Sequence, residues 1–223
     1  MVSEKSVIIF GTGGSCIHCD FVADEVWGCN GAFTVINVMP EKLKKYFRMD
    51  KLFLTDFMYE VEGRLNFDIV AMNEFASEYN CEVISMRKMK LGKYELKCKL
   101  LPYNRLVNNW GTNYFTDSIT YMIAYALNTN TVLAQSPTGV IRRELKQPLR
   151  IRLFGVDMVT TKEYQASKGG IEFWLGIARG LGAEIEVAQG SAIMANPQGR
   201  PYGRPYTYIL KDVDPYGLLK KRE

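Results

Sequence analysis

The feature that most constrains the fold is a short apolar run that ends in glycines near the start of the chain. Residues 6–10 read Ser-Val-Ile-Ile-Phe, which is typical of a strand buried on both faces of a parallel sheet. Glycines that follow such a strand let the backbone approach a ligand, and consecutive N–H groups can hold phosphate oxygens. The loop that would do so here consists of Gly11, Thr12, Gly13, Gly14 and Ser15.

Apolar runs and segments of helical spacing alternate along the rest of the chain. Further strands are expected at 26–29, 51–55, 82–86, 151–156 and 183–187. A short helical turn is expected at 19–23, and helices at 33–47 (interrupted by Pro40), 72–79, 119–127 and 171–178. Thr116 is the expected N-cap of the helix at 119–127. This alternation predicts an α/β, Rossmann-like fold: a mainly parallel sheet with helices on both faces.

A chain of 223 residues is long enough to bury a full core, and one domain is expected over residues 1–195. Two hairpin or loop insertions interrupt the alternation, at about 87–112 and about 130–148, the second turning at 136–139. Residues 196–223 contain Gly-Arg-Pro-Tyr twice in succession and are expected to form a solvated surface tail. The tail and the insertions are the segments through which a partner protein or a second copy could bind.

Composition narrows the class of protein. With 28 basic and 24 acidic residues, the net charge of +4 is too mild to indicate a nucleic-acid partner. The chain has no apolar run of transmembrane length, and residues 1–5 lack a signal-peptide pattern. Five cysteines, an odd number without framework spacing, favour a reducing compartment. A cytoplasmic protein that does not span a membrane is therefore expected.

Small or polar residues follow each predicted strand. In open α/β sheets ligands bind at the carboxyl ends of the strands, where Asn30, Asp56, Ser85 and Asp157 would join the glycine loop. Ser118 would open the helix whose N-terminus faces the same edge, where the helix dipole favours an anion. Each residue type is also common in turns, but the whole set predicts one ligand-binding cleft.

The roles expected within this cleft differ. The glycine loop and Ser118 would hold phosphates, and Asn30 would contact a base or ribose. Asp56 and Asp157 are the candidate catalytic residues, which would hold a Mg²⁺ ion or orient an acceptor. The motif is neither a Walker loop, because no lysine follows the glycines, nor a complete dinucleotide fingerprint, because Cys16 stands at the third glycine position. Asn30, where NAD dehydrogenases carry an acid, argues against that class.

Cys16, His18 and Cys19, with Cys29 further along, are residue types that bind zinc. Their spacing does not match a zinc module, so we expect no metal site and interpret the cysteines as small residues packed under the loop. His18 is the only histidine, so a histidine general base would have to be His18.

Four segments together resemble a known family. They are the loop G-x-G-x-S at 11–15, the W-G-x-N run that ends at Asn30, the helix start at 115–119 and the G-V-D-M strand end at 155–158. They are similar to the Rossmann-like domain of 6-hydroxymethylpterin diphosphokinase-like proteins, to a related arrangement in bacterial CMP-sialic-acid sialyltransferases, and to uncharacterised phage and bacterial proteins. The resemblance implies binding of a nucleotide or nucleotide sugar. The sialyltransferases use a histidine base late in the chain, and no histidine follows His18 here.

Three hypotheses about function follow. The leading one is a nucleotide-dependent transferase of the diphosphokinase or glycosyltransferase kind, in which catalysis is mostly positioning and charge stabilisation. The second is a non-catalytic protein that binds or sequesters a nucleotide. The third is a structural or assembly protein, as in phages, that inherited the fold.

Overall fold

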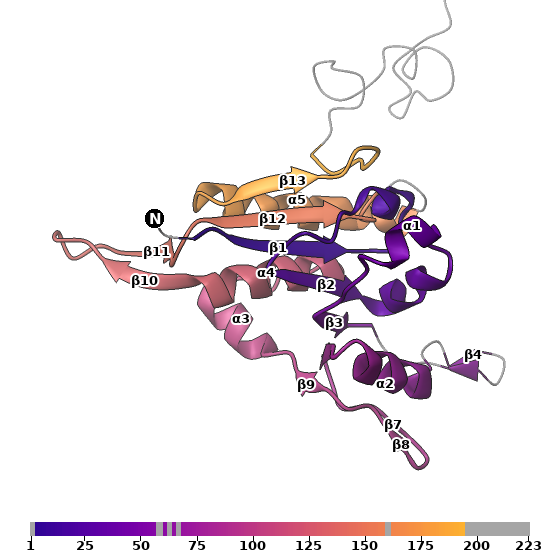
Figure 1. Ribbon diagram of the computed structural model, residues 1–223. Coiled ribbons are helices and arrows are strands. Elements are labelled where there is room, and N and C mark those ends of the chain that lie inside the picture. The colour runs from indigo at the N-terminus through magenta and orange to yellow at the C-terminus, as the bar shows by residue number, and fades with distance from the viewer. Residues whose placement is uncertain (1–2, 57–59, 62–63, 66–67, 159–161, 195–223) are drawn as a thin grey trace, which may run out of the picture. The chain divides into compact units, whose positions relative to one another are not determined.

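A seven-stranded parallel sheet forms the centre of the fold (Figure 1). The computed structural model describes residues 3–56, 60–61, 64–65, 68–158 and 162–194, and the elements below belong to the unit formed by residues 1–193. In spatial order the strands are β13 (Glu184–Val187), β12 (Leu149–Phe154), β1 (Lys5–Phe10), β2 (Glu25–Cys29), β3 (Lys51–Leu54), β6 (Glu82–Ser85) and β9 (Lys99–Leu100). Every neighbouring pair is parallel.

Helices cover both faces of this sheet. Successive side chains of β1 point to opposite faces and show which helices cover each face. Val7 and Ile9 point into a core built with helices α3 (Tyr103–Trp110), α4 (Ser118–Asn130) and α5 (Lys162–Gly180). Ile8 and Phe10 point into a second core. That core is built with the 3₁₀ helices η1 (Gly14–His18) and η2 (Asn30–Asn37), the short helix α1 (Glu41–Lys44) and helix α2 (Ile69–Glu78). These four apolar side chains of β1 are fully buried, as the apolar run predicts.

The strand order contains one reversal. From β1 the chain adds β2, β3, β6 and β9 on one side, then returns to place β12 and β13 on the other side of β1. The switch point therefore lies between β1 and β12, the place at which ligands bind in open α/β sheets. The Rossmann-like α/β fold expected from the sequence is confirmed.

Several local predictions are corrected. The turn expected at 19–23 lies earlier, as η1, because Gly13 and Gly14 start it. The expected helix over 33–47 is the 3₁₀ helix η2 followed by the single turn α1, with Pro40 between them. The N-cap of α4 is Asp117 and not Thr116, and its side chain accepts from the Thr120 amide in a capping box.

The first expected insertion is only partly a hairpin. Strands β7 (Lys90–Leu91) and β8 (Tyr94–Glu95) form one, but β9 then joins the main sheet beside β6, and α3 packs under α4. The second expected insertion is a hairpin, β10 (Thr131–Gln135) with β11 (Ile141–Leu145), as predicted. Strands β4 (Glu60–Val61) and β5 (Arg64–Leu65) also pair. The expected tail at 196–223 lies outside the described residues.

Within the described ranges, no helix is both long enough and apolar enough to cross a membrane.

Candidate functional site

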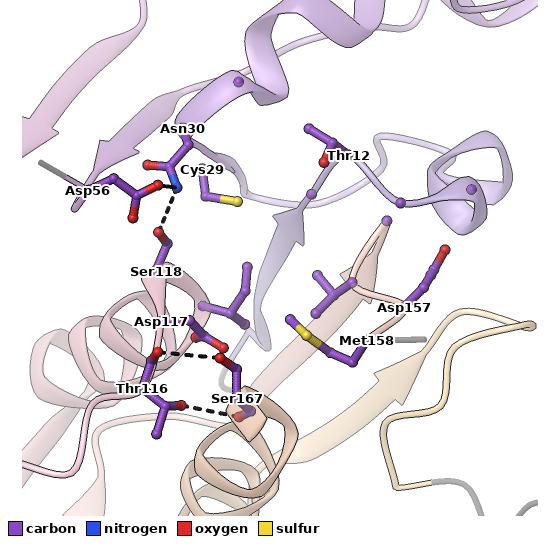
Figure 2. A pocket seen from close by; sticks show the side chains of 17 residues that line it. Thr12, Cys29, Asn30, Asp56, Thr116, Asp117, Ser118, Asp157, Met158 and Ser167 are labelled. Atoms are coloured by element: carbon purple, nitrogen blue, oxygen red, sulfur yellow. Dashed lines mark hydrogen bonds between the residues drawn. The ribbon is translucent and has the colours of Figure 1, made fainter. Parts of the chain in front are cut away.

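A pocket of about 640 Å³ opens at the carboxyl edge of the sheet, at the switch point (Figure 2). Its walls are the loops after β1, β2, β3 and β12, the N-terminus of α4 and one residue of α5. We call it the switch-point pocket. Its position follows from topology, because parallel strands all end at the same edge and bring distant segments together.

Most of the residues predicted for the cleft line this pocket. They are Gly11, Thr12, Gly13, Gly14, Asn30, Asp56, Ser118 and Asp157. Ser15 does not line it; the side chain is buried beneath the loop. Ser85 does not line it either, and its hydroxyl accepts from the Arg87 amide at the end of β6. The pocket also contains residues that the sequence reasoning did not assign, notably Thr116, Asp117 and Ser167.

Asp157 holds the glycine loop in place. The Ser15 amide donates to Asp157 Oδ2 at 3.0 Å, and the Ser15 hydroxyl donates to Asp157 Oδ1. The same hydroxyl accepts from the Gly155 amide at 2.9 Å, and the Gly13 amide donates to the Gly155 carbonyl oxygen at 2.8 Å. The loops after β1 and β12 are thus joined across the switch point by several hydrogen bonds.

This junction explains why glycines are needed there. A Cβ atom on Gly11 would lie 2.4 Å from the Gly155 carbonyl oxygen, and one on Gly13 would lie 2.6 Å from Asp157 Oδ2. Gly155 has a φ of +68°, and its own Cβ would lie 2.4 Å from the Gly11 carbonyl oxygen. Gly14 is different, since its Cβ would meet only Asp157 Oδ2, at 3.7 Å. Close packing of the two loops therefore accounts for three of these glycines, but not for Gly14.

Two amides of the loop remain available. Gly11 donates to the Phe154 carbonyl oxygen, Gly13 to Gly155, and Ser15 to Asp157. Within the described residues the amides of Thr12 and Gly14 have no acceptor. Amide groups of this kind at the rim of a pocket are suitable donors for an anionic or carbonyl oxygen.

Asn30 links the second wall of the pocket to α4. Its amide nitrogen donates to Asp56 Oδ2 at 2.7 Å and to the Ser118 hydroxyl at 2.9 Å, and that hydroxyl lies 2.5 Å from the Thr55 hydroxyl. The backbone of Asn30 has a φ of +46°, a conformation that asparagine tolerates better than most residues. Its Oδ1 atom is buried and has no hydrogen-bond partner in the described part of the chain.

Asp117 is an acidic residue of the pocket whose carboxyl group is largely buried. Burial raises the pKa of its carboxyl to about 6, although hydrogen bonds from the Thr120 and Ile119 amides act in the opposite direction. Its Oδ2 atom is buried and, among the described residues, accepts no hydrogen bond of good geometry. The nearby Ser167 hydroxyl donates instead to the Thr116 carbonyl oxygen, at 3.4 Å. The sequence shows that Asp117 lies at the start of a helix, but the burial of its carboxyl depends on tertiary packing, which the sequence does not show.

The charge of the pocket is one-sided. Asp56, Asp117 and Asp157 line it, and its described lining includes no lysine, arginine or histidine. Figure 2 shows Asp56 beside Asn30 and Asp157 across the pocket at the glycine loop. The two carboxylates therefore belong to different walls of the pocket, and the expectation that they hold a Mg²⁺ ion beside a phosphate stays a prediction.

The cysteines and His18 lie apart from this chemistry. Cys16 and Cys19 are buried in the core on one face of the sheet, whereas Cys29 packs against the core on the other face. Burial raises the pKa of Cys19 and of Cys29 to about 12, so both are thiols at neutral pH. His18 is exposed and does not line the pocket. The described residues contain no group of three or more His, Cys, Asp or Glu side chains that could hold a metal ion.

Comparison of the chain with protein-family models, curated proteins and solved structures gave no match. The geometry of the pocket is therefore what bears on function. It offers backbone donors at the glycine loop and a carboxyl group whose pKa lies close to neutral pH. Donors of this kind suit an anionic or carbonyl oxygen of a ligand.

Proposed function

We propose that the chain binds a nucleotide or nucleotide sugar in the switch-point pocket and acts as a transferase. The observation that carries the proposal is the glycine loop at the rim of a pocket of ligand size, where the amides of Thr12 and Gly14 have no acceptor among the described residues. Free backbone amides at such a rim are suited to the phosphate oxygens of a nucleotide. The hydroxyl and carboxyl groups on the other walls of the pocket would bind the ribose and the base.

The anionic end of the ligand belongs at the glycine loop. The free amides of Thr12 and Gly14 would donate to phosphate oxygens, and Gly14 leaves the space that a phosphate needs. The described lining offers no basic side chain, so backbone dipoles would carry this interaction. That favours a ligand with few phosphate charges at the loop.

Asp157 would orient a hydroxyl of the ligand. An ionised carboxylate has about four lone-pair sites, and Ser15 uses two of them, which leaves capacity for a ribose or acceptor hydroxyl. Asp56 supports the other wall by accepting from Asn30 and so fixes the direction in which Asn30 Oδ1 points. In this proposal both aspartates position other groups.

Asp117 is the group best suited to proton transfer. A carboxyl group whose pKa is about 6 is partly protonated near neutral pH and can act as a general base or a general acid. Asp117 would take the proton of the acceptor hydroxyl as that oxygen bonds to the transferred group. At the same time the bond between that group and the bound nucleotide would break, and the rest of the nucleotide would leave with the electron pair.

A non-catalytic binder is the second candidate, and one observation favours it. Transfer of a phosphoryl or glycosyl group develops negative charge on the leaving oxygen, which enzymes usually stabilise with cations. No described residue that lines the pocket is cationic. Hydrolysis or transfer of a labelled nucleotide by the purified protein distinguishes the two candidates, since a binder retains the ligand without turnover.

The first experiment is mass spectrometry of the small molecules released when the purified protein is denatured, followed by calorimetric titration with the nucleotide found. The matched variants are Gly14→Asp and Gly14→Asn, which add side chains of the same size but different charge at a position with room for a Cβ. We expect the aspartate variant to bind at least about tenfold more weakly than the asparagine variant, a difference of about 1.4 kcal/mol.

Equal affinity of the two variants would remove the phosphate from the glycine loop. Absence of any bound nucleotide, together with no heat on titration with nucleoside mono- and diphosphates or nucleotide sugars, would reject nucleotide binding altogether.

A further inference from the structure

The positive charge of the chain is concentrated in one short segment. Residues 87–99, which we call the basic hairpin, contain six basic residues and one acidic residue, a net charge of +5. The whole chain has a net charge of +4, so everything outside this segment sums to −1. An average over the chain hides this concentration, because association with polyanions depends on local charge density.

The basic hairpin is anchored on one side and exposed on the other. Met89 and Leu96 are buried in the core that includes α2, and the Leu96 amide donates to the Met89 carbonyl oxygen at 2.9 Å. The side chain of Asn73 on α2 donates to the Glu95 carbonyl oxygen at 2.9 Å and accepts from the Lys97 amide at 3.0 Å. Figure 1 shows the hairpin beyond α2, at the β9 side of the sheet.

Because side chains alternate along a strand, this anchoring turns the lysines outward. Met89 and Leu96 face the core, so Lys88, Lys90 and Lys97 belong to the opposite face. All three are exposed, as is Lys93 in the two-residue turn. In the described ranges, none of these four ammonium groups forms an ion pair with a carboxylate, whereas Lys99 pairs with Glu82 at the base.

An aromatic ring lies at the end of the hairpin. Tyr94 is 46% exposed, and the ammonium group of Lys93 lies 5.3 Å from the centre of its ring. Unpaired cations next to an accessible aromatic ring are the combination by which proteins hold single-stranded nucleic acids: the cations contact phosphates and the ring stacks on a base.

We propose that the basic hairpin is a docking surface for single-stranded nucleic acid. Lys88, Lys90 and Lys97 contact successive phosphates on the outer face. Tyr94, which the alternation places on the other face, stacks on a base where the nucleic acid passes around the turn at Lys93. The lysines act as point charges, so the binding has little sequence preference and depends strongly on salt. This surface is separate from the switch-point pocket, so the proposal does not depend on the function assigned to the pocket.

A membrane surface is the other polyanion to consider, and the turn argues against it. A hairpin that inserts into lipid presents apolar side chains at its tip, with basic residues behind them. Here the turn itself consists of Gly92 and Lys93. A lysine at the leading position suits a phosphate and opposes entry into the acyl region.

The test uses fluorescence anisotropy of the full chain with a labelled oligothymidylate of about 20 nucleotides, from about 50 to 200 mM KCl. The variant is K88Q/K90Q/K97Q. The control K42Q/K45Q/K146Q removes the same charge from exposed lysines elsewhere. We expect at least about tenfold weaker binding for the hairpin variant at the lowest salt, and a salt slope smaller by about 2, at about 0.7 per phosphate contact. The control keeps the parent's slope.

Tyr94 adds a readout that charge alone would not change. Tyr94→Ala should weaken binding severalfold without changing the salt slope, and Tyr94→Phe should restore it because the stacking ring is retained. Three results would overturn the proposal: no binding by the parent at the lowest salt, an equal loss in the charge-matched control, or hairpin-dependent binding to phosphatidylserine vesicles without binding to the oligonucleotide.

Discussion

The switch-point pocket and the basic hairpin are held in shape by different means. In the pocket, two loops approach so closely that Gly11, Gly13 and Gly155 have no space for a Cβ atom, and hydrogen bonds join segments more than a hundred residues apart. The hairpin has two buried side chains, the partly buried Cys98 and one asparagine clamp, and its charged side chains and Tyr94 are exposed. The pocket is therefore constrained by backbone geometry and the hairpin mainly by its base.

The pocket and the hairpin also differ in the sign and the burial of their charged groups. The pocket is lined by three carboxyl groups, one of them buried enough to raise its pKa to about 6. The hairpin carries exposed lysines, of which Lys99 alone among those described pairs with a carboxylate. A site that needs defined geometry is built where groups are buried, whereas a surface that needs only charge can remain mobile and exposed. Substitutions should therefore have large effects on stability in the pocket and small ones in the hairpin.

The largest difference should come from alanine at two glycines of similar conformation. Gly155 at the pocket has a φ of +68°, and Gly92 in the hairpin turn has a φ of +56°. Gly92 has open space around it, so Gly92→Ala costs only the left-handed backbone, about 1–2 kcal/mol. Gly155→Ala adds a clash with the Gly11 carbonyl and should cost about 3–5 kcal/mol in all.

Thermal and urea unfolding followed by circular dichroism measure both variants. The expected fall in Tm for Gly155→Ala is about 6–20 °C, at about 2–4 °C per kcal/mol for a domain of this size. Similar losses at the two glycines would mean that the loops after β1 and β12 can separate without much cost, which would contradict the tight junction.

The next largest effect is the pH dependence contributed by Asp117. Its pKa is raised from 3.8 to about 6 in the folded state, so the folded protein holds this proton more tightly than the unfolded chain does. Stability should therefore fall as pH rises from about 4 to about 6, by at most about 3 kcal/mol at 1.36 kcal/mol per pKa unit. Asp117→Asn keeps a good N-cap, should lose this dependence, and should be more stable than the parent above pH 6.

The control for Asp117 is Asp68→Asn. Asp68 also caps a helix, accepting from the Val70 and Ala71 amides at the start of α2, but it lies outside the pocket. Chemical denaturation at several pH values should show the parent's profile for Asp68→Asn and a flattened one for Asp117→Asn. An unchanged profile in Asp117→Asn would assign the pH dependence to another group.

The sequence predicted the fold because burial leaves a direct trace in it. Uninterrupted apolar runs such as 7–10 that end in glycines are typical of strands covered on both faces, and all seven strands of the sheet are parallel. The position of the pocket followed from the same topology, which is why Asn30, Asp56 and Asp157 could be expected at one edge. The roles of these residues in binding stay predictions.

What the sequence did not predict depends on contacts between distant segments. Ser15 was expected to face a ligand, but 142 positions later Asp157 takes both its amide and its hydroxyl. Asp117 lies within the predicted helix start at 115–119, but its raised pKa depends on burial by tertiary packing. The strand β9 has two residues, too few to show a period, and α3 buries only Leu106 completely, so neither was expected.

The smallest effect concerns the clamp at the base of the basic hairpin. Asn73→Ala removes two hydrogen bonds to the hairpin backbone, each worth about 0.5–1.5 kcal/mol, while alanine favours the helix by about 0.5 kcal/mol. The global stability should therefore fall by about 0.5–2.5 kcal/mol. The local effect should be larger, because Met89 and Leu96 alone would then hold the hairpin, and the hairpin would open without unfolding of the sheet.

Limited trypsin digestion measures this opening directly, since the lysines of the hairpin are cleavage sites once the backbone is free. Asn108→Ala, an exposed asparagine on α3, provides the matched control. Faster cleavage within residues 87–99 in Asn73→Ala, with the control like the parent and a fall in Tm of no more than about 10 °C, is the expected result. Equal cleavage rates in all three proteins would show that the two buried side chains fix the hairpin by themselves, and the contrast with the pocket would then be one of charge and not of rigidity.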